Sequence, residues 1–491
     1  MRQSIRFLRR GRVVEIGGLD LRTTLLDYLR LSERSVGTKE GCAEGDCGAC
    51  TVVLGRLRGD RLSYEPVNAC ILLLGQLDGA EMVTIEDLAS PEGLHPVQEA
   101  MVARHGSQCG FCTPGIVMSL FALYHGDRPV SHDDVNDALA GNLCRCTGYR
   151  PIVEAALEAC TAPPQDAFIA RRATTEAALA ALDDGEDVLW EEGDGFFAAP
   201  ASEAALAEMY EAHPDATLVA GCTDVGLRLT KDLAQPGKTI WLGRVQGLDG
   251  IEEGPETLSL GATVSHLHAA RALAALDPDL GELMRRFGGV QVRAAGTVGG
   301  NIANGSPIGD LAPAFIALGA TLELRQGERI RNLPLEDFFL AYRKQDRVPG
   351  EFVRRVIVRK PRPGAAFRCF KVSKRLDEDI SAVMGAFNVA IGGRRIASAR
   401  IAYGGMAGVP KRASAAEAAI AGASLDEPAS WQPALEALSR DFTPLADQRA
   451  SAAYRALVAR NLLFKVLTEI ASGGTGETRI GAWREMPDAA E

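Results

Sequence analysis

Eight of the eleven cysteines form two groups in the first third of the chain, and their spacing could hold redox-active metal centres. The first group follows the pattern Cys42-x4-Cys47-x2-Cys50, with Cys70 further on, which is typical of a plant-type [2Fe–2S] cluster. Glycines and other small residues fill the loop from Gly41, so it can turn tightly and direct backbone N–H groups at the sulfurs. A four-cysteine zinc site is the alternative, but its usual spacing is two Cys-x2-Cys pairs. The pattern therefore favours iron over zinc.

The second group combines two pairs, Cys109-x2-Cys112 and Cys144-x-Cys146. Four thiolates suffice for another two-iron cluster, but zinc is a fair competitor because Cys-x-Cys alone is not diagnostic. In a reducing compartment such clustering indicates metal or redox chemistry rather than structural disulfides. The remaining cysteines are isolated and are predicted to be small buried apolar residues: Cys160, Cys222 and Cys369.

Two glycine-rich segments in the second half could bind a nucleotide. They are residues 218–226 (LVAGCTDVG) and 296–310 (GTVGGNIANGSPIGD). Such runs expose successive backbone N–H groups that can cradle a pyrophosphate, and Asp310 could then accept from a ribose hydroxyl. The first segment taken alone is more typical of a surface turn. No Gly-x-Gly-x-x-Gly occurs, so a Rossmann dinucleotide fold has no support.

Composition excludes several function classes. The formal charge of −11 argues against a nucleic-acid partner or an anionic membrane surface, since both require a basic footprint. No apolar run approaches the ~18 residues of a membrane span, and the first ten residues contain no continuous apolar core typical of a secretory signal. We expect a cytoplasmic protein.

Hydrophobic patterning predicts a multidomain α+β chain. Residues 1–88 read as short strands around one helix with a threonine cap, and residues 89–162 as helices only, at 96–105, 114–124 and 133–143. Residues 163–202 read as a linker, 203–362 as alternating strands and helices, and 363–472 as a smaller α+β unit. Residues 473–491 are predicted to be a tail.

In this order the units closely resemble the iron–sulfur/FAD subunit of the bacterial xanthine dehydrogenases, in the molybdenum hydroxylase family. The resemblance covers about residues 3–472, and its most specific runs are 41–50 (GCAEGDCGAC), 108–115 (QCGFCTPG) and 142–149 (NLCRCTGY). It implies a β-grasp [2Fe–2S] ferredoxin domain (1–88) and an all-helical [2Fe–2S] domain (89–162). It further implies an α+β FAD-binding domain (203–362) and a small α+β C-terminal flavoprotein domain (363–472).

The resemblance also assigns residues to cofactors. Both cysteine quartets would hold [2Fe–2S] clusters, and Gln108 would approach the pterin of a molybdenum cofactor on a partner chain. Phe287 would pack beside the isoalloxazine of FAD. Near the NAD site the matching positions are Tyr342, Asp379 and Ile380. The other implied FAD contacts are Leu218, Val219, Ala220, Gly221, Cys222, Thr223, Asp224, Val225, Thr297, Val298, Gly299, Gly300, Asn301, Asp310 and Lys371.

The implied function is electron transfer. Purine hydroxylation, hypoxanthine to xanthine to urate, would occur at the molybdenum–molybdopterin site of a large partner subunit, and no residue of this chain would catalyse it. Electrons would pass through the cluster at Cys109, then the cluster at Cys42, then FAD, and on to NAD⁺. FAD can convert single electrons into a hydride. Family resemblance suggests an α2β2 heterotetramer.

Three alternatives stay open. The chain could serve another molybdenum hydroxylase, acting on an aldehyde, an N-heterocycle or an aromatic thioester. A quinone or a ferredoxin could replace NAD⁺ as the acceptor. From a different class, the chain could be a non-catalytic iron–sulfur redox sensor, although the dense glycine segment at 296–310 argues against this.

Overall fold

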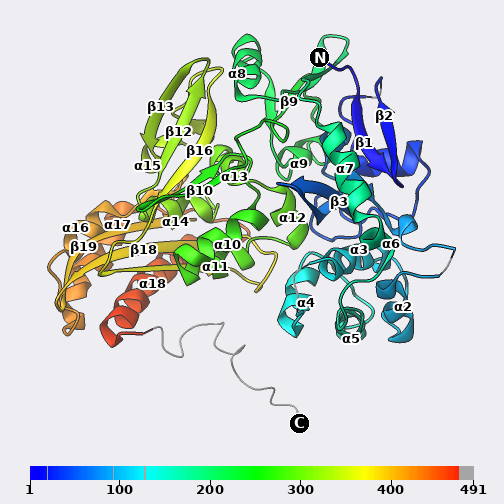
Figure 1. The fold of residues 1–491 in the computed structure, drawn as a ribbon. Coiled ribbons are helices and arrows are strands. Elements are labelled where there is room, and N and C mark those ends of the chain that lie inside the picture. Colours follow the sequence, from blue (N-terminus) through cyan, green and yellow to red (C-terminus); the bar gives the residue numbers. More distant parts are fainter. Residues whose placement is uncertain (19, 92, 127–128, 475–491) are drawn as a thin grey trace.

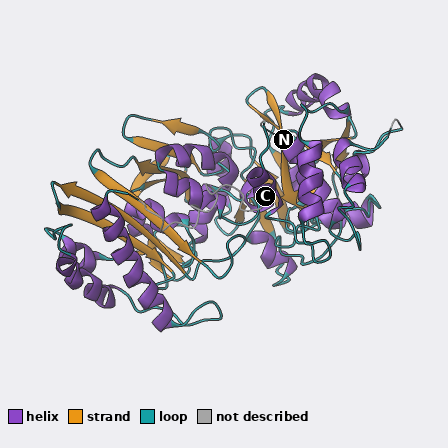
Figure 2. Cartoon of the chain, turned by 90° about the horizontal axis from the view of Figure 1, so that it is seen from below, coloured by secondary structure: helices purple, strands orange, loops and turns teal. Residues whose placement is uncertain are grey.

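The computed structural model describes residues 1–18, 20–91, 93–126 and 129–474. In Figure 1 the N-terminal sheet and the helices that follow it lie on one side, and the C-terminal sheet lies on the other. The helices of the glycine-rich region lie between them. Figure 2, seen from below, shows the same division, with helices packed against the sheets. The predicted tail lies almost wholly outside the described residues.

The first unit is a five-stranded sheet in the order β2-β1-β5-β3-β4. β1 and β5 run parallel, and the other neighbours are antiparallel. The predicted capped helix is α1 (Leu25–Asp27), where Thr24 accepts a hydrogen bond from the Asp27 amide. The strands are β1 (Ile5–Arg9), β2 (Arg12–Ile16), β3 (Thr51–Arg58), β4 (Arg61–Asn68) and β5 (Glu81–Val83).

The second unit is helical between its loops, as its 3.6-residue periodicity predicts. Ser131 caps the third helix by accepting from the Asp134 amide. The helices are α2 (Pro96–Ala103), α3 (Thr113–Tyr124), α4 (His132–Leu139) and α5 (Arg150–Ala159).

The segment predicted as a linker is largely folded. It contains α6 (Ala167–Ala170), α7 (Arg172–Leu182) and the hairpin of β6 (Val188–Glu192) and β7 (Gly195–Ala199). This hairpin joins β8 (Thr217–Val219) and β9 (Lys238–Trp241) in a four-stranded sheet of order β6-β7-β9-β8. Trp190, Phe196 and Phe197 are buried there, and that apolar burial holds the segment in place.

The glycine-rich region combines this sheet with a five-stranded antiparallel sheet of order β10-β11-β16-β12-β13. Short helices connect the two sheets and carry the glycine segments. The strands of the second sheet are β10 (Ile251–Glu253), β11 (Thr257–Gly261), β12 (Thr321–Gln326), β13 (Arg329–Pro334) and β16 (Phe352–Arg359). The helices are α8 (Glu203–Ala212), α9 (Val225–Thr230), α10 (His266–Leu276), α11 (Pro278–Arg285), α12 (Val290–Ala295), α13 (Val298–Asn304), α14 (Leu311–Ala317) and α15 (Leu335–Phe338).

The C-terminal unit is the small α+β domain that the sequence predicts. Its sheet has the order β17-β18-β19-β20, and its main strands pair antiparallel. One hydrophobic core runs from α13 and α14 into β17 and β18, so this unit and the glycine-rich region share a core. Its elements are β17 (Ala365–Val372), β18 (Val383–Gly392), β19 (Arg395–Gly404), β20 (Lys411–Arg412), α16 (Ser414–Ile420), α17 (Gln432–Asp441) and α18 (Ala452–Ser472).

Among the described residues, no helix is both long enough and apolar enough to cross a lipid bilayer.

Candidate functional site

The first cysteine quartet converges in the loop before β3. The Sγ atoms of Cys50 and Cys70 lie 3.3 Å apart, and the Cys42 Sγ accepts from the amides of Glu44 and Cys47, both at 3.4 Å. Contacts with the thiols of Cys47 and Cys70 hold the pKa of Cys42 far below its usual range. Thiolates that accept backbone N–H bonds are the donor set that an iron–sulfur cluster requires.

Glycines make this loop possible. Gly45 and Gly48 have φ of +77° and +69°, a region that other residues rarely adopt. A Cβ at Gly41 would lie 2.7 Å from the Sγ of Cys47, so glycine leaves the space beside that sulfur free. The quartet thus fits a [2Fe–2S] group, as predicted.

The second quartet brings together the turn before α3 and the turn before α5. Cys109 interacts with Cys146, and Cys112 interacts with Cys144. The Cys144 Sγ also lies 3.1 Å from the Thr147 hydroxyl. Two chain segments therefore deliver four thiols to one place, which fits a second cluster.

This second quartet opens to the surface. Cys109 and Cys146 are exposed, as is the neighbouring Gln108. Two apolar side chains beside them, Phe111 and Leu143, are 49% and 47% exposed. Two thiols of this quartet are therefore accessible from the surface of the chain.

The glycine-rich region encloses a cavity of about 760 Å³. Its wall includes most of the residues predicted to contact FAD, namely Leu218, Ala220, Gly221, Cys222, Thr223, Asp224, Val225, Phe287, Thr297, Gly299, Gly300, Asn301, Asp310 and Lys371. Val219 and Val298 do not line it; both are fully buried in hydrophobic cores, because their side chains point away from the cavity. The assignment of these residues to FAD remains a prediction.

The two glycine segments form adjoining parts of this wall. A Cβ at Gly221 would lie 1.8 Å from the carbonyl oxygen of Ala295, and a Cβ at Gly299 would lie 2.6 Å from Ala262. The first segment is thus packed against the backbone that leads into the second, not free as a surface turn. Thr297 caps α13 by accepting from the Gly300 amide at 3.0 Å. The resulting cradle of backbone suits a phosphate group.

Asp310 is held by protein partners. Its carboxylate accepts from the Lys371 ammonium at 2.6 Å and from the Ser381 hydroxyl at 2.5 Å, and all three residues are buried. Each oxygen has a second lone pair, so a ribose hydroxyl could still be bound. The pair also connects α14 to β17 at the cavity.

His266 is a cavity residue that the sequence did not reveal. Its ring lies 4.3 Å from that of Phe287, and its buried Nδ1 has no hydrogen-bond partner among the described residues. Burial, with a contribution from the charge of Arg293, lowers the pKa of His266 to about 3. A neutral imidazole whose Nδ1 has no hydrogen-bond partner among the described residues therefore lines the cavity predicted to bind the flavin. Its only sequence signal is the Ser265 cap of α10.

The first cysteine loop also reaches the cavity. Glu44, Gly45 and Asp46, which lie between Cys42 and Cys47, are part of its wall. None of the four cysteines of the second quartet lines the cavity. The order of the two clusters relative to the cavity could not be read from the sequence, because it depends on how distant segments pack.

The residues predicted near NAD are separated. Asp379 and Ile380 line the cavity, and Asp379 accepts from the Arg375 amide at 2.8 Å. Tyr342 is 60% exposed and outside the cavity wall, with the Arg343 guanidinium 5.4 Å from its ring centre. Glu378, which also lines the cavity, has its pKa raised to about 8 by burial and by nearby Asp46.

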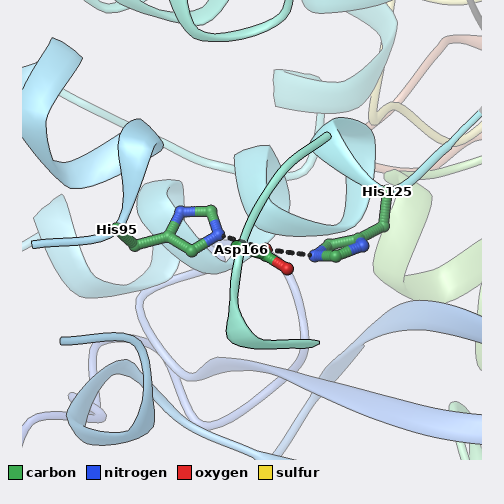
Figure 3. A group of neighbouring side chains, drawn as sticks. All are labelled: His95, His125 and Asp166. Atoms are coloured by element: carbon green, nitrogen blue, oxygen red, sulfur yellow. Dashed lines mark hydrogen bonds and ion pairs between the residues drawn. The ribbon is translucent and has the colours of Figure 1, made fainter. Parts of the chain in front are cut away.

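A buried His–Asp–His group lies apart from the cysteines (Figure 3). His95 and His125 flank Asp166, with their Nε2 atoms 2.7 and 2.9 Å from one carboxylate oxygen. The Nδ1 of His95 accepts from the Val97 amide at 3.2 Å, so its Nε2 carries the proton and is not free to bind a metal ion. The group instead fastens α6 to the helical unit.

Comparison with known proteins identifies four domains. The models matched are a 2Fe-2S iron-sulfur cluster binding domain (residues 11–74), a [2Fe-2S] binding domain (84–157), the FAD binding domain in molybdopterin dehydrogenase (193–361) and the CO dehydrogenase flavoprotein C-terminal domain (368–470). They agree with the predicted order of units.

Full-length relatives and solved structures give the same result. Xanthine dehydrogenase of Emericella nidulans is 32% identical over 89% of this chain, which spans 36% of that protein. A carbon monoxide dehydrogenase chain from Hydrogenophaga pseudoflava is 27% identical with a TM-score of 0.52, covering 55% of this chain and 94% of its own. A chain of quinoline 2-oxidoreductase from Pseudomonas putida 86 is 25% identical with a TM-score of 0.51, and the match covers 56% of this chain and 96% of that chain. The chain spans about a third of the length of the xanthine dehydrogenases it matches. With both cysteine quartets and the glycine-lined cavity in one polypeptide, it belongs to the molybdenum hydroxylase family, as an electron-transfer chain that carries two [2Fe–2S] domains and an FAD domain.

Proposed function

We propose that this chain is the iron–sulfur/FAD subunit of a xanthine dehydrogenase. A large molybdopterin-binding partner hydroxylates hypoxanthine to xanthine and xanthine to urate, and this chain carries the electrons to NAD⁺. Two copies of each chain form the complex. The complex works in the cytoplasm, where thiols stay reduced.

The position of the first cysteine loop carries the proposal. Residues 44–46 line the cavity, whereas Cys109 and Cys146 of the other quartet are exposed beside Phe111 and Leu143. This arrangement supports entry of electrons at the exposed second quartet and their exit at the cavity. Gln108 then lies at the entry, where the partner's pterin would approach.

The cavity residues support a hydride-exchanging flavin at the exit. When bound, FAD exchanges single electrons with iron–sulfur clusters and a hydride with NAD⁺. Phe287 and the neutral His266 offer a stacked, partly apolar wall for its ring system. The backbone around Gly221 and Gly300 offers N–H groups for its phosphates.

The test is an anaerobic titration of the purified chain with NADH. If NAD is the acceptor, NADH bleaches the flavin and then the clusters, even without the partner. A flavin that NADH leaves oxidised, but a quinol or a reduced ferredoxin reduces, would exclude NAD as the acceptor. The substrate is tested separately, with hypoxanthine and xanthine added to the complex with the partner.

A second candidate is the same role in another molybdenum hydroxylase. It is favoured by the structural similarity to chains of carbon monoxide dehydrogenase and quinoline 2-oxidoreductase. The two candidates differ in the partner's substrate, so turnover of quinoline or an aldehyde, but not of purines, would select the second. Absence of flavin from the purified chain would favour the redox sensor instead.

A further inference from the structure

One buried glutamine joins the cavity region to both cysteine units. Gln291 lies on α12, the helix that begins directly after the cavity residues Gly288 and Gly289, and is 1% exposed. Its carboxamide nitrogen donates to the Thr51 hydroxyl at 3.0 Å, the Ser119 hydroxyl at 3.1 Å and the side-chain Oδ1 of Asn142 at 3.0 Å. Two N–H groups are thus shared among three acceptors.

These acceptors lie beside the cluster ligands. Thr51 follows Cys50 directly, Asn142 is two residues before Cys144, and Ser119 is on α3, the helix that begins after Cys112. Each of the three is at most 2% exposed. We name Gln291, Thr51, Ser119 and Asn142 the Gln291 junction.

The junction is closed by further bonds to the first cysteine loop. The Ser119 hydroxyl donates to the Asn142 Oδ1 at 2.6 Å. Both the Asn142 Nδ2 and the Thr51 hydroxyl donate to the Gly48 carbonyl oxygen, at 3.1 and 2.6 Å. Gly48 lies between Cys47 and Cys50. The junction therefore spans both quartets through hydrogen bonds that are shielded from water and are strengthened by the low local dielectric.

Three glycines allow the backbones of the two cysteine units and the Gln291 side chain to lie in close contact. A Cβ at Gly141 would lie 1.7 Å from the Gln291 Oε1, one at Gly48 would lie 2.0 Å from the Gly141 carbonyl oxygen, and one at Gly115 would lie 2.1 Å from that of Gly48. At the same place the amide of Leu143, next to Cys144, donates to the carbonyl oxygen of Cys47 at 3.0 Å. A single hydrogen bond thus joins Cys47, of the first quartet, to the residue that precedes Cys144, of the second.

We propose that the Gln291 junction fixes the separation and orientation of the two iron–sulfur centres, and that Gln291 is a positioning residue for electron transfer between them. In that step one electron leaves the reduced cluster and enters the oxidised one, with no bond made or broken. Electron tunnelling weakens steeply with distance, so a small displacement of one loop slows the transfer. The proposal rests on the electron-transfer role of the family and holds for any substrate or acceptor.

The test compares the intact chain with Gln291→Leu, which keeps the side-chain bulk and removes the donors. Both proteins are first assayed for iron, sulfide and flavin, which should be equal. We expect the magnetic interaction between the two reduced clusters, seen by electron paramagnetic resonance, to change. After photoreduction of the flavin by a light flash, the transfer of electrons between the two clusters should be slower than in the unchanged protein.

Gln76→Leu is the matched control. Gln76 is also a buried glutamine (3% exposed) that donates across units, to the Ala220 carbonyl oxygen at 3.1 Å, but it contacts neither Asn142 nor Ser119. It should leave the magnetic interaction between the clusters unchanged. A merely structural role for Gln291 would lower the melting temperature without altering that interaction.

A milder variant keeps the proposal testable if Gln291→Leu does not fold. Ser119→Ala removes one member of the junction and leaves no bulk to accommodate. It should also change the magnetic interaction between the clusters and slow the electron transfer between them, but by less than Gln291→Leu. Clusters that are both present, with unaltered magnetic interaction and unaltered transfer rate in either folded variant, would overturn the proposal.

Discussion

At the scale of single residues, the eight cysteines in the two quartets are the ones whose chemistry the sequence predicts best. Ligand identity depends on side-chain type and local spacing, and both are printed in the sequence. Cys160 and Cys369 are buried in cores as predicted. Cys222 is also buried, yet it lines the cavity with φ of +66°, which its isolation in the sequence does not show.

Replacing one ligand tests whether the quartets are independent. Cys144→Ser removes a thiolate of the second quartet only, and the domains have separate ligand sets. We expect iron to fall from about four to about two atoms per chain, with FAD retained. Iron analysis, flavin analysis and the electron paramagnetic resonance spectrum check this. Loss of both clusters and the flavin together would contradict the modular assignment.

His266 shows what the sequence could not predict at this scale. A lone histidine after a serine cap is ordinary, and only the packing of α10 against Phe287 makes it a cavity residue. The same holds for Glu44 and Asp46, which the cysteine pattern treats as spacers but which form part of the cavity wall. Long-range packing decides these roles.

At the scale of elements, helices and strands with strong periodicity were predicted within a few residues, as for α3 and β17. Segment 163–202 was less predictable. Its proline pair and acidic run are typical of a linker, but the hairpin β6–β7 is stabilised by partners far away in the sequence, including β9. Local composition does not report such partners.

The contact between the two glycine segments can be tested with Gly221→Ala. The new methyl group would meet the Ala295 carbonyl oxygen, so the two segments must separate, at a cost of about 1–3 kcal/mol. We expect the variant to purify with less flavin and full iron. Gly237→Ala is the control, since a Cβ there meets nothing within 4 Å. Equal flavin content in both variants would refute the proposed cradle.

At the scale of the whole molecule, the stability contributed by two buried histidines should fall on acidification, whereas Glu378, whose pKa is raised by burial, contributes in the opposite direction. Burial is the main cause that lowers the pKa of both His125 and His266 below 6.5, so just below pH ~6.5 these two residues bind more protons in the unfolded chain than in the folded chain. The stability that these two histidines contribute is therefore present above pH ~6.5 and declines below it, by at most about 1.4 kcal/mol per histidine and pH unit. The lowered pKa of Asp166 extends the loss below pH ~3.9.

Urea unfolding of the flavin-free chain between pH 7.5 and about 5 measures this slope. His266→Leu should flatten it, because the variant has one titrating group fewer. His132→Gln, which alters an exposed histidine, should leave it in place. A slope that is the same in all three proteins would rule out His266 as a source of the pH dependence.

The exposed surface around the second quartet should be where the partner docks. Phe111 and Leu143 are half exposed in the two segments that carry Cys109 and Cys146, and a partner protein that docks there would cover both apolar side chains. Phe111→Ser should weaken assembly with the molybdopterin partner by about tenfold or more while leaving iron and flavin content unchanged. Leu457→Ser is the control, because Leu457 is 55% exposed and its helix, α18, lies on the opposite side of the molecule from α3 and α5 (Figure 1). Analytical ultracentrifugation of each variant mixed with the partner measures how much complex forms. Unchanged assembly of the Phe111 variant would place the electron entry elsewhere, and the second quartet would then need another explanation for its exposure.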